Sequence, residues 1–282
     1  MISTSSTSSH TIGIIGMNGR MGQGLVQACA TTLPEARVIG YDKRRGDKGH
    51  YVDSLDELWQ TSSVVLDFSH ASLFPEVIRT AVACPKPFVL GTSGVEHDDV
   101  HHHLKALAQY VPVMWAPNTC LGAVLQRWMA HHIATVIPTS YDVDIVEMHH
   151  RYKEDSPSGT ALALAQAISQ GNSQQDRPGQ TVLSWGLASS PRPEGRIEMH
   201  AMRVSHIPCQ HRAMWTSPME QLEITHTVFS RDALVQGAVD LLIWLLSPKR
   251  AKRLYSVEDR WGLSLPTPPH TEGGSFTTDE RI

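Results

Sequence analysis

The stretch TIGIIGMNGRMGQGLVQACA, residues 11–30, most constrains the fold because it joins a short apolar strand to a helix through a glycine-bearing turn. A parallel sheet holds a dinucleotide at a turn of this kind. Gly16 would permit the tight turn, Gly19 the approach of the backbone to a pyrophosphate, and Gly22 close packing of the helix. Asn18 stands where a second glycine is usual, and asparagine tolerates left-handed backbone better than most residues.

The next predicted strand, in ARVIGYDKRR, ends on an acidic residue roughly 20 residues after this turn, where a ribose-binding acid is expected. Asp42 suits the two hydroxyls of an NAD ribose. Lys43, Arg44 and Arg45 could neutralise the additional phosphate of NADP. The sequence therefore predicts that either NADH or NADPH binds. The same basic run could equally be a solvated loop.

Strand and helix signals alternate through the first 120 residues, which predicts an α/β fold with a Rossmann-type parallel sheet covered by helices. Ligands of such sheets lie at the carboxyl ends of the strands. The strand-end residues are therefore expected to contact the cofactor: Phe68, Gly91, Thr92, Ser93, Ala116 and Asn118.

The run HHRYKEDSPSGT, residues 149–160, combines cationic, proton-transferring and anion-binding groups around one predicted strand-to-helix turn. DVDIVEMH before it predicts the strand, and SGTALALAQAI at its end predicts the helix. The backbone N–H groups of Ser158, Gly159 and Thr160 would open this helix, where unsatisfied donors and the helix dipole favour a carboxylate or phosphate. Lys153 adds positive charge beside them. The turn is therefore expected to bind a small anionic substrate.

Two histidines precede this turn, and histidine can supply a proton near neutral pH. Adjacent residues of a strand point to opposite faces, so at most one of His149 and His150 would normally enter a given cleft. A single histidine on a polar face is usually only solvated, and Ser-Gly-Thr could be an ordinary helix cap. Because Lys153 accompanies these groups, a catalytic site is the favoured interpretation.

The pattern changes after residue 120, where a helical stretch leads to the strand before the turn and several later strands follow without intervening helices. These segments predict a second, α+β domain with a mixed or antiparallel sheet, which could also provide an oligomer interface. We expect a dinucleotide-binding domain over 1–120, completed by a helix over 231–250, and a substrate-binding and oligomerisation domain over 121–230. An extended tail is expected over 256–282, where periodicity fades.

Composition and charge exclude several classes of protein. The chain is 41% hydrophobic and 18% charged, as in ordinary globular proteins, and its net charge of -4 argues against nucleic acid as a partner. The longest apolar run, DLLIWLL, is too short to cross a bilayer, so no membrane association is expected. Four cysteines without CxxC spacing, and an N-terminus without a targeting pattern, favour the cytoplasm. Consecutive histidines on a helix point in different directions, so no metal site is expected.

Seven motifs, in this order, resemble the 4-hydroxy-tetrahydrodipicolinate reductase family of bacterial lysine and diaminopimelate biosynthesis, also called dihydrodipicolinate reductase: GMNGRMG, DFS, GTSG, APN, HHRYKEDSPSGT, LEITH and VQGAV. The resemblance spans most of the chain. HHRYKEDSPSGT is the most specific of these motifs, since it is similar to the family's HHRHKxDxPSGT.

The resemblance implies hydride transfer from NADH or NADPH to C4 of a small anionic dicarboxylate ring, with loss of the 4-hydroxyl as water and protonation at the adjacent carbon. It also implies a homotetramer. By the same resemblance His149 is the general acid and Lys153 its catalytic partner, while His150, Gly159 and Thr160 contact the substrate carboxylates. The implied nucleotide contacts are Gly16, Met17, Asn18, Gly19, Arg20, Met21, Asp42, Lys43, Gly91, Thr92, Ser93, Ala116, Pro117, Asn118 and Thr119.

Three departures from the family pattern bear on the substrate. Tyr152 stands where a histidine is usual, and APNTCLG replaces the common NFSxG. The family's RxGDxxGEH reads RVSHIPCQH here, so that only Arg203 and His211 match. If this loop closes over the substrate, the substrate could be another small anionic cyclic imine. A non-catalytic nucleotide-binding protein is the remaining alternative, and the intact His149 and Lys153 argue against it.

Overall fold

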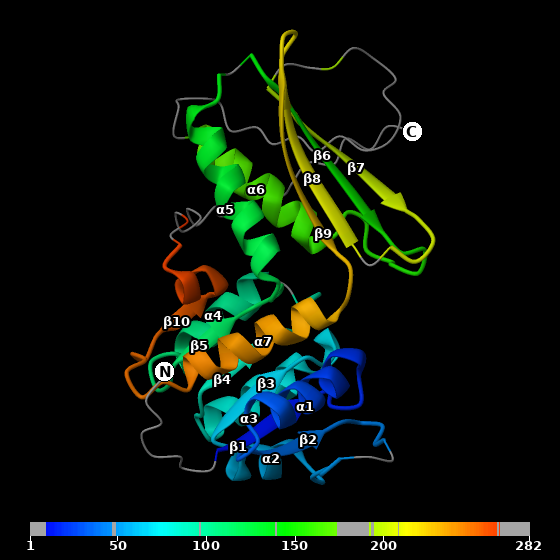
Figure 1. Cartoon of the computed structure of the whole chain (residues 1–282). Helices are drawn as coiled ribbons and strands as arrows, with labels where there is room; N and C mark the ends of the chain where they lie inside the picture. The colour runs from blue at the N-terminus through cyan, green and yellow to red at the C-terminus, as the bar shows by residue number, and fades with distance from the viewer. Residues whose placement is uncertain are drawn as a thin grey trace. The chain divides into compact units, whose positions relative to one another are not determined.

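The computed structural model describes residues 10–46, 49–95, 97–138, 140–173, 192, 195–207, 209–263 and 265. The chain divides into two compact units, which Figure 1 shows with their helices and strands labelled. Unit 1 comprises Met1–Cys120 and Asp232–Gly262, and unit 2 comprises Leu121–Arg231 and Leu263–Ile282. None of the described helices combines the length and the apolarity that a bilayer crossing requires.

Unit 1 is built on a six-stranded sheet in the order β10-β5-β4-β3-β1-β2, and every pair of neighbouring strands is parallel. The strands are β1 (Thr11–Ile15), β2 (Arg37–Tyr41), β3 (Val64–Asp67), β4 (Phe88–Leu90), β5 (Val113–Trp115) and β10 (Leu254–Ser256). Their central residues are buried on both faces of the sheet, which suits short runs of Ile, Val and Leu. The predicted Rossmann-type parallel sheet is confirmed.

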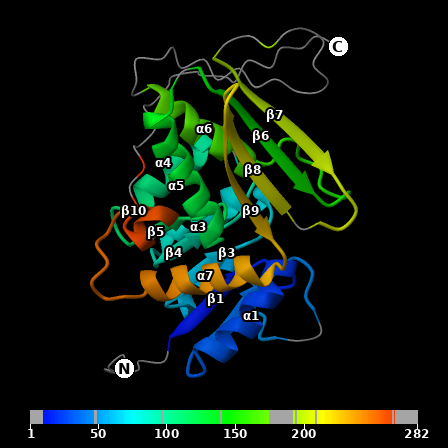
Figure 2. The ribbon, with the colours of Figure 1, turned by 45° about the horizontal axis from the view of Figure 1, so that its top comes forward.

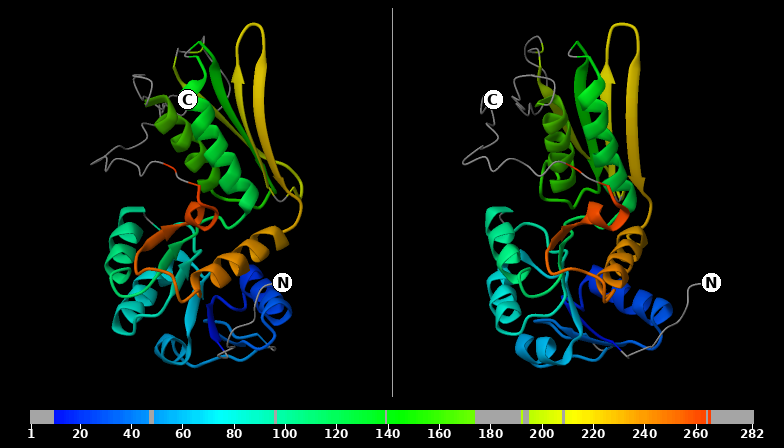
Figure 3. Two further views of the ribbon diagram at one scale, coloured as in Figure 1. Left: turned by 60° about the vertical axis from the view of Figure 1, so that its left-hand side comes forward. Right: turned by 90° about the vertical axis from the view of Figure 1, so that its left-hand side faces the viewer.

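Helices cover both faces of this sheet, as the two views in Figure 3 show. They are α1 (Arg20–Thr32), α2 (Leu55–Thr61), α3 (Phe74–Ala83), α4 (His97–Leu107) and α7 (Asp232–Leu245), with a short 3-10 helix η1 (Ala71–Leu73) before α3. α2, α3 and α4 bury Trp59, Val77 and Leu104 against one face. α1 and α7 pack together, and a Cβ atom on Gly24 would lie only 2.7 Å from a methyl group of Val235.

The segment after α7 contradicts part of the sequence prediction. An extended tail was expected over 256–282, but β10 (Leu254–Ser256) joins the edge of the parallel sheet and the 3-10 helix η2 (Val257–Trp261) follows it. Residues 264 and 266–282 of this expected tail lie outside the described residues. Ser256 and Asp259 form a reciprocal capping box that stabilises the start of η2. β10 reads Leu-Tyr-Ser after the basic run KRAKR, whereas β4 and β5, which have the same length, are wholly apolar, so the sequence pattern missed β10.

Unit 2 has a four-stranded sheet in the order β7-β6-β8-β9. β6 (Asp142–His149) runs parallel to β7 (Ile197–Arg203) and antiparallel to β8 (Cys209–Thr216), which pairs antiparallel with β9 (Gln221–Val228). The sheet is therefore mixed, as predicted. Two helices, α5 (Leu121–Val136) and α6 (Gly159–Ser173), lie together on one face of this sheet (Figure 2).

The alternation of side chains along the strands decides which groups lie under these helices. On β6, Val143, Ile145, Glu147 and His149 are buried, whereas the residues between them are only partly covered. Ile145 packs with Leu164 of α6 and neighbouring apolar groups in the core of this unit. The same face of one strand therefore carries two apolar residues followed by an acid and a histidine.

Candidate active site

The predicted strand-turn-helix is confirmed, because β6 ends at His149 and α6 begins at Gly159. Ser158 caps the helix: its hydroxyl accepts a hydrogen bond from the N–H of Ala161 at 3.2 Å, and its carbonyl accepts from the N–H of Leu162 at 3.0 Å. The turn is also tied to the segment that follows β7, because the N–H of Arg151 donates to the carbonyl of Ser205 at 3.1 Å. These bonds position the residues between the strand and the helix.

The two histidines of the turn have different surroundings. His149 is 6% exposed, and its ring meets that of His211 edge-on, with centroids 5.1 Å apart. His150 is half-buried, and its ring centroid lies 6.3 Å from that of the exposed Tyr152. The two imidazoles are therefore not interchangeable, as the alternation of a strand predicts.

Glu147 lies directly beneath His149 and is fully buried. Its Oε2 lies against Nδ1 of His149, while its Oε1 accepts from the N–H of Ser158 at 3.1 Å and from Arg203 Nη1 at 3.2 Å. Burial opposes ionisation, but the hydrogen bond and charge of His149, with those of Arg203 and Ser158, outweigh it and lower the pKa of Glu147 to about 2. Glu147 is therefore a carboxylate at neutral pH.

His211 completes this cluster from β8, where it stands opposite Glu147 in the strand register. Its Nε2 lies 3.0 Å from the hydroxyl of Ser158. Burial first, and then the nearby charge of His149, lower the pKa of His211 to about 3, so its imidazole is neutral at pH 7. The cluster thus holds one carboxylate and one neutral imidazole beside His149.

Arg203 and Lys153 supply the positive charge of the site. Arg203 donates from Nε to the carbonyl of Lys153 at 3.1 Å and from Nη2 to the carbonyl of Asp155, so it holds the turn against β7. Lys153 has its ammonium 2.7 Å from the carboxylate of Asp155, and its side chain is 22% exposed. Arg203 is 21% exposed and Arg151, in the same turn, is exposed, so Lys153 is one of three cations here that keep access to solvent.

One part of the predicted anion site is wrong. The N–H of Ser158 was expected to be available to a bound anion, but it donates to the buried carboxylate of Glu147 at 3.1 Å, and Ser158 itself is 2% exposed. Gly159 and Thr160 open the first turn of α6, and Gly159 is exposed. Of the three residues, only Gly159 and Thr160 stay predicted anion contacts.

Glu147, His149 and His211 each offer a ligand atom within 4.8 Å of the others, which is a spacing that a metal ion could use. However, the guanidinium of Arg203 already compensates the carboxylate, so we interpret these groups as a hydrogen-bonded network. A similar grouping of Asp144, Glu198 and His200 lies on the opposite face of the sheet, where Nη1 of Arg192 is 2.9 Å from Asp144. The absence of a metal site stays a prediction.

The glycine turn of unit 1 has the geometry that a nucleotide requires. Gly16 has a φ of +79°, and a Cβ atom there would lie 2.7 Å from the carbonyl oxygen of Phe68. Gly19 caps α1, and a Cβ atom on Gly22 would collide with the carbonyl of Gly16. Only glycine fits Gly16 and Gly22, and the N-terminus of α1 is left free of acidic residues.

The strand register brings most of the other predicted nucleotide contacts to the same edge. Ile15 pairs with Asp67, Asp67 with Leu90, and Leu90 with Trp115, so the residues that follow these four form one row at the carboxyl ends of the strands. That row consists of Gly16, Phe68, Gly91 and Ala116. Thr92 and Thr119 are buried just beyond it, and Thr119 donates to the carbonyl of Leu234 at 2.6 Å. The side chain of Thr119 therefore anchors the loop to α7.

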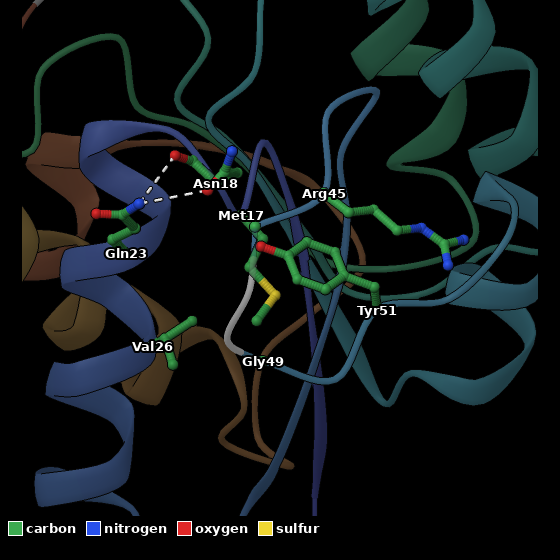
Figure 4. Close-up of a pocket in the computed structure, with 8 residues that line it drawn as sticks. Met17, Asn18, Gln23, Val26, Arg45, Gly49 and Tyr51 are labelled. Atoms are coloured by element: carbon green, nitrogen blue, oxygen red, sulfur yellow. Dashed lines mark hydrogen bonds between the residues drawn. The ribbon is translucent and has the colours of Figure 1, made fainter.

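A pocket of about 630 Å³ lies beside the same turn and is shown in Figure 4. It is lined by Met17, Asn18, Gln23, Val26, Arg45, Gly46, Gly49 and Tyr51. Asp42 adjoins it, with its carboxylate accepting from the N–H groups of Asn18 at 2.9 Å and Arg44 at 3.0 Å. Arg45 lines the pocket and forms an ion pair with Asp53, whereas Lys43 is exposed and not among the lining residues. The family resemblance instead implies Lys43 as the basic contact of the nucleotide.

Comparison with known proteins agrees with this geometry. The model of the dihydrodipicolinate reductase N-terminus matches residues 10–119, and that of the C-terminus matches residues 122–260. The 4-hydroxy-tetrahydrodipicolinate reductase of Campylobacter jejuni is 32% identical over 89% of this chain and 99% of its own length, and that of Zymomonas mobilis is 33% identical over 91% and 98%.

Solved structures show the same fold. A dipicolinate-bound dihydrodipicolinate reductase from Paenisporosarcina sp. TG-14 superposes with a TM-score of 0.67 at 22% identity, and the match covers 88% of this chain and 97% of that one. Two family models that together span both units, and relatives above 30% identity along nearly their full length, confirm the resemblance predicted from the motifs. The chain belongs to the dihydrodipicolinate reductase family.

Proposed function

We propose that this chain reduces 4-hydroxy-tetrahydrodipicolinate to tetrahydrodipicolinate in lysine and diaminopimelate biosynthesis. Its relatives carry the name of this reductase, and membership of the family makes the chain an NAD(P)-dependent oxidoreductase. The observation that carries the assignment is the buried pair of Glu147 and His149 next to Lys153 and the exposed start of α6. This set of groups can bind an anion and protonate it.

The reaction removes the 4-hydroxyl of the substrate as water, adds a hydride at C4 and adds a proton at the neighbouring carbon. NADH or NADPH supplies the hydride when bound, and the glycine turn of unit 1 fits its pyrophosphate. His149 donates the proton. Lys153 stabilises the negative charge that develops, as a preorganised cation does. His150, Gly159 and Thr160 bind the two carboxylates of the ring.

The altered segment between β7 and β8 is compatible with this substrate. Arg203 and His211, which match the family pattern, are the residues that contact Glu147 and Ser158. Gln210, which differs from the family pattern, lies next to His211 on β8. Its side-chain amide donates to the hydroxyl of Thr227, its partner on β9, at 2.8 Å. Arg203 and His211 therefore keep the contacts to Glu147 and Ser158, while Cys209, which also differs from the pattern, stands opposite His149 in the strand register. This favours the dipicolinate precursor over another cyclic imine.

Oxidation of NADPH, followed by its absorbance with enzymatically generated substrate, tests the proposal. We expect turnover with this substrate and no comparable turnover with a panel of other anionic cyclic imines. Turnover of another imine at a higher kcat/KM would establish the altered-substrate alternative. Nucleotide binding without turnover of any of them would establish a non-catalytic role.

We also propose a homotetramer that forms through the unit 2 sheet. α5 and α6 cover one face of this sheet, and among the described residues no helix covers the other. That uncovered face carries Val146, Met148 and Met214 beside charged groups, as an interface between copies would. Native mass spectrometry should give a mass four times that of the chain, and a monomer at micromolar concentration would contradict the assembly.

A cytoplasmic location is the final part of the proposal. All four cysteines, Cys29, Cys84, Cys120 and Cys209, are free thiols in the structure, which suits a reducing compartment. Fractionation of the source cells should recover the protein with cytoplasmic markers, and recovery in an exported fraction would contradict this location.

A further inference from the structure

The two oxygens of the buried Glu147 carboxylate have separate partners. Oε1 accepts from the N–H of Ser158 at 3.1 Å and from Arg203 at 3.2 Å, and these contacts bind the turn and β7 to β6. Oε2 faces Nδ1 of His149, two residues further along the same face of the strand. One oxygen therefore holds the turn in place, and the other contacts the imidazole of His149.

This contact fixes the orientation and the tautomer of His149. A carboxylate can only accept a hydrogen bond, so the proton that lies between the two groups is on Nδ1, and the neutral ring leaves Nε2 as its basic atom. The His211 ring, whose centroid is 5.1 Å away and whose plane is inclined by 72°, packs against the His149 ring and limits its rotation. His149 can thus exchange a proton only through Nε2.

The charges around this pair favour the same arrangement. Arg203 contacts Oε1 of the Glu147 carboxylate, and Lys153 contacts Asp155. These contacts leave Oε2 of Glu147 to His149. Burial keeps His211 neutral, so it does not compete with His149 for Glu147. The titratable or charged groups that face the pair from the elements packed around it are Lys153, Arg203, Cys209, His211 and His226.

We propose that Glu147 is a positioning residue for the reaction: it holds His149 as the Nδ1–H tautomer, aims its Nε2 at the substrate and provides the counter-charge when Nε2 carries the proton. The inference rests on the proposed function, in which His149 is the proton donor. In this inference the proton donor of the reaction is a carboxylate–imidazole pair, Glu147 and His149, instead of a single histidine. A carboxylate that orients a catalytic imidazole acts in this way in other enzymes.

Replacing Glu147 by Gln tests the inference, because the amide keeps the size of the side chain and removes its charge. We expect kcat to fall by at least about 10²-fold with little change in KM, since an orienting carboxylate acts on the transition state. The alkaline limb of the pH profile of kcat should move to lower pH by about one unit or more. Glu147→Asp, which keeps the charge at a greater distance, should recover part of the activity.

Asp144→Asn provides a matched control on the same strand. Asp144 points to the opposite face of the sheet and pairs with Arg192 at 2.9 Å, so this change removes a charged partner without touching His149. Because Asp144 lies on the face proposed as the subunit interface, native mass spectrometry first checks that the control keeps the native assembly; it should then keep the native kcat and the native pH profile. If Glu147→Gln also keeps the native kcat and the native pH profile, Glu147 does not position His149 for the reaction and the inference is overturned.

The resting protein gives a second readout that depends neither on activity nor on a variant of Glu147. Nitrogen-15 NMR is carried out on histidine-labelled native protein, and the His149 signals are assigned by their loss in His149→Gln. At a pH where the His149 ring is neutral, these signals should be those of the Nδ1–H tautomer. An Nε2–H tautomer would overturn the inference. If the native protein has this tautomer but does not reduce the substrate, the proposed function fails while the pairing stands; if it reduces the substrate and Glu147→Gln keeps native kinetics, only the inference fails.

Discussion

Acid should weaken the fold of unit 2 through His211, and the structure gives the size of the effect. The folded state lowers the pKa of this imidazole from 6.5 to about 3 because the ring is buried and lies beside His149. In the unfolded chain His211 therefore binds a proton below about pH 6.5, whereas in the folded protein it stays neutral down to about pH 3. The stability that depends on neutral His211 is fully present above pH 6.5 and is lost as the pH falls from 6.5 toward 3. Between pH 7 and pH 5 this single group should cost about 2 kcal/mol of unfolding free energy.

His211→Gln tests this effect, because glutamine does not titrate and its amide can still meet the hydroxyl of Ser158. Urea unfolding followed by far-UV circular dichroism at pH 8, 7 and 5 gives the free energies for both proteins. Between pH 7 and pH 5 the native protein should lose about 2 kcal/mol more than the variant, whereas between pH 8 and pH 7 the two should change alike. His226, whose pKa burial also lowers, is present in both proteins and cancels. Equal losses between pH 7 and pH 5 would refute the reasoning.

Three further predictions concern the ligands and the nucleotide turn. Lys43→Ala and Arg45→Ala should each weaken NADPH more than NADH in calorimetric titrations, because both remove positive charge near the predicted ribose phosphate; equal losses for the two cofactors would show that neither residue reads the phosphate. Gly16→Ala should lower the melting temperature and weaken nucleotide binding, since a φ of +79° and a Cβ atom 2.7 Å from the carbonyl of Phe68 both strain the turn, and unchanged values would contradict the role of this glycine. Lys153→Ala should lower turnover strongly, and 2,6-pyridinedicarboxylate should inhibit the native protein competitively; no binding at millimolar concentration would count against a dicarboxylate substrate.

The sequence predicts the parts of this molecule whose signals are local. Alternating strands and helices predict the parallel sheet of unit 1, and the alternation before His149 with the Ala-rich run after Gly159 predicts β6 and α6. The cofactor edge also follows from local signals, because parallel strands of a sheet end together. β10 has no such signal, because it follows a basic run and ends on Ser256, and the prediction of an extended tail was wrong over residues 256–261 for that reason.

The partners of His149 could only be predicted in part. Glu147 has a usable signal, since it lies two residues before His149 on a strand whose inward positions are otherwise apolar, and an acid at such a position needs a buried partner. Arg203 and His211 have no such signal. Their contacts depend on the register of β7 and β8 against β6, and residues separated by more than 50 positions in the chain are brought together by that register alone.

The most direct test of the account is the kinetics of His149→Gln in the NADPH-oxidation assay. The account predicts that kcat falls by about 10² to 10⁴-fold, the usual contribution of a positioned proton donor, and that the alkaline limb of the pH profile disappears. NADPH binding should survive, because all of the expected nucleotide contacts belong to unit 1. His150→Gln should instead mainly raise KM, as the loss of a substrate contact does. Near-native turnover of His149→Gln with an unchanged pH profile would contradict the account.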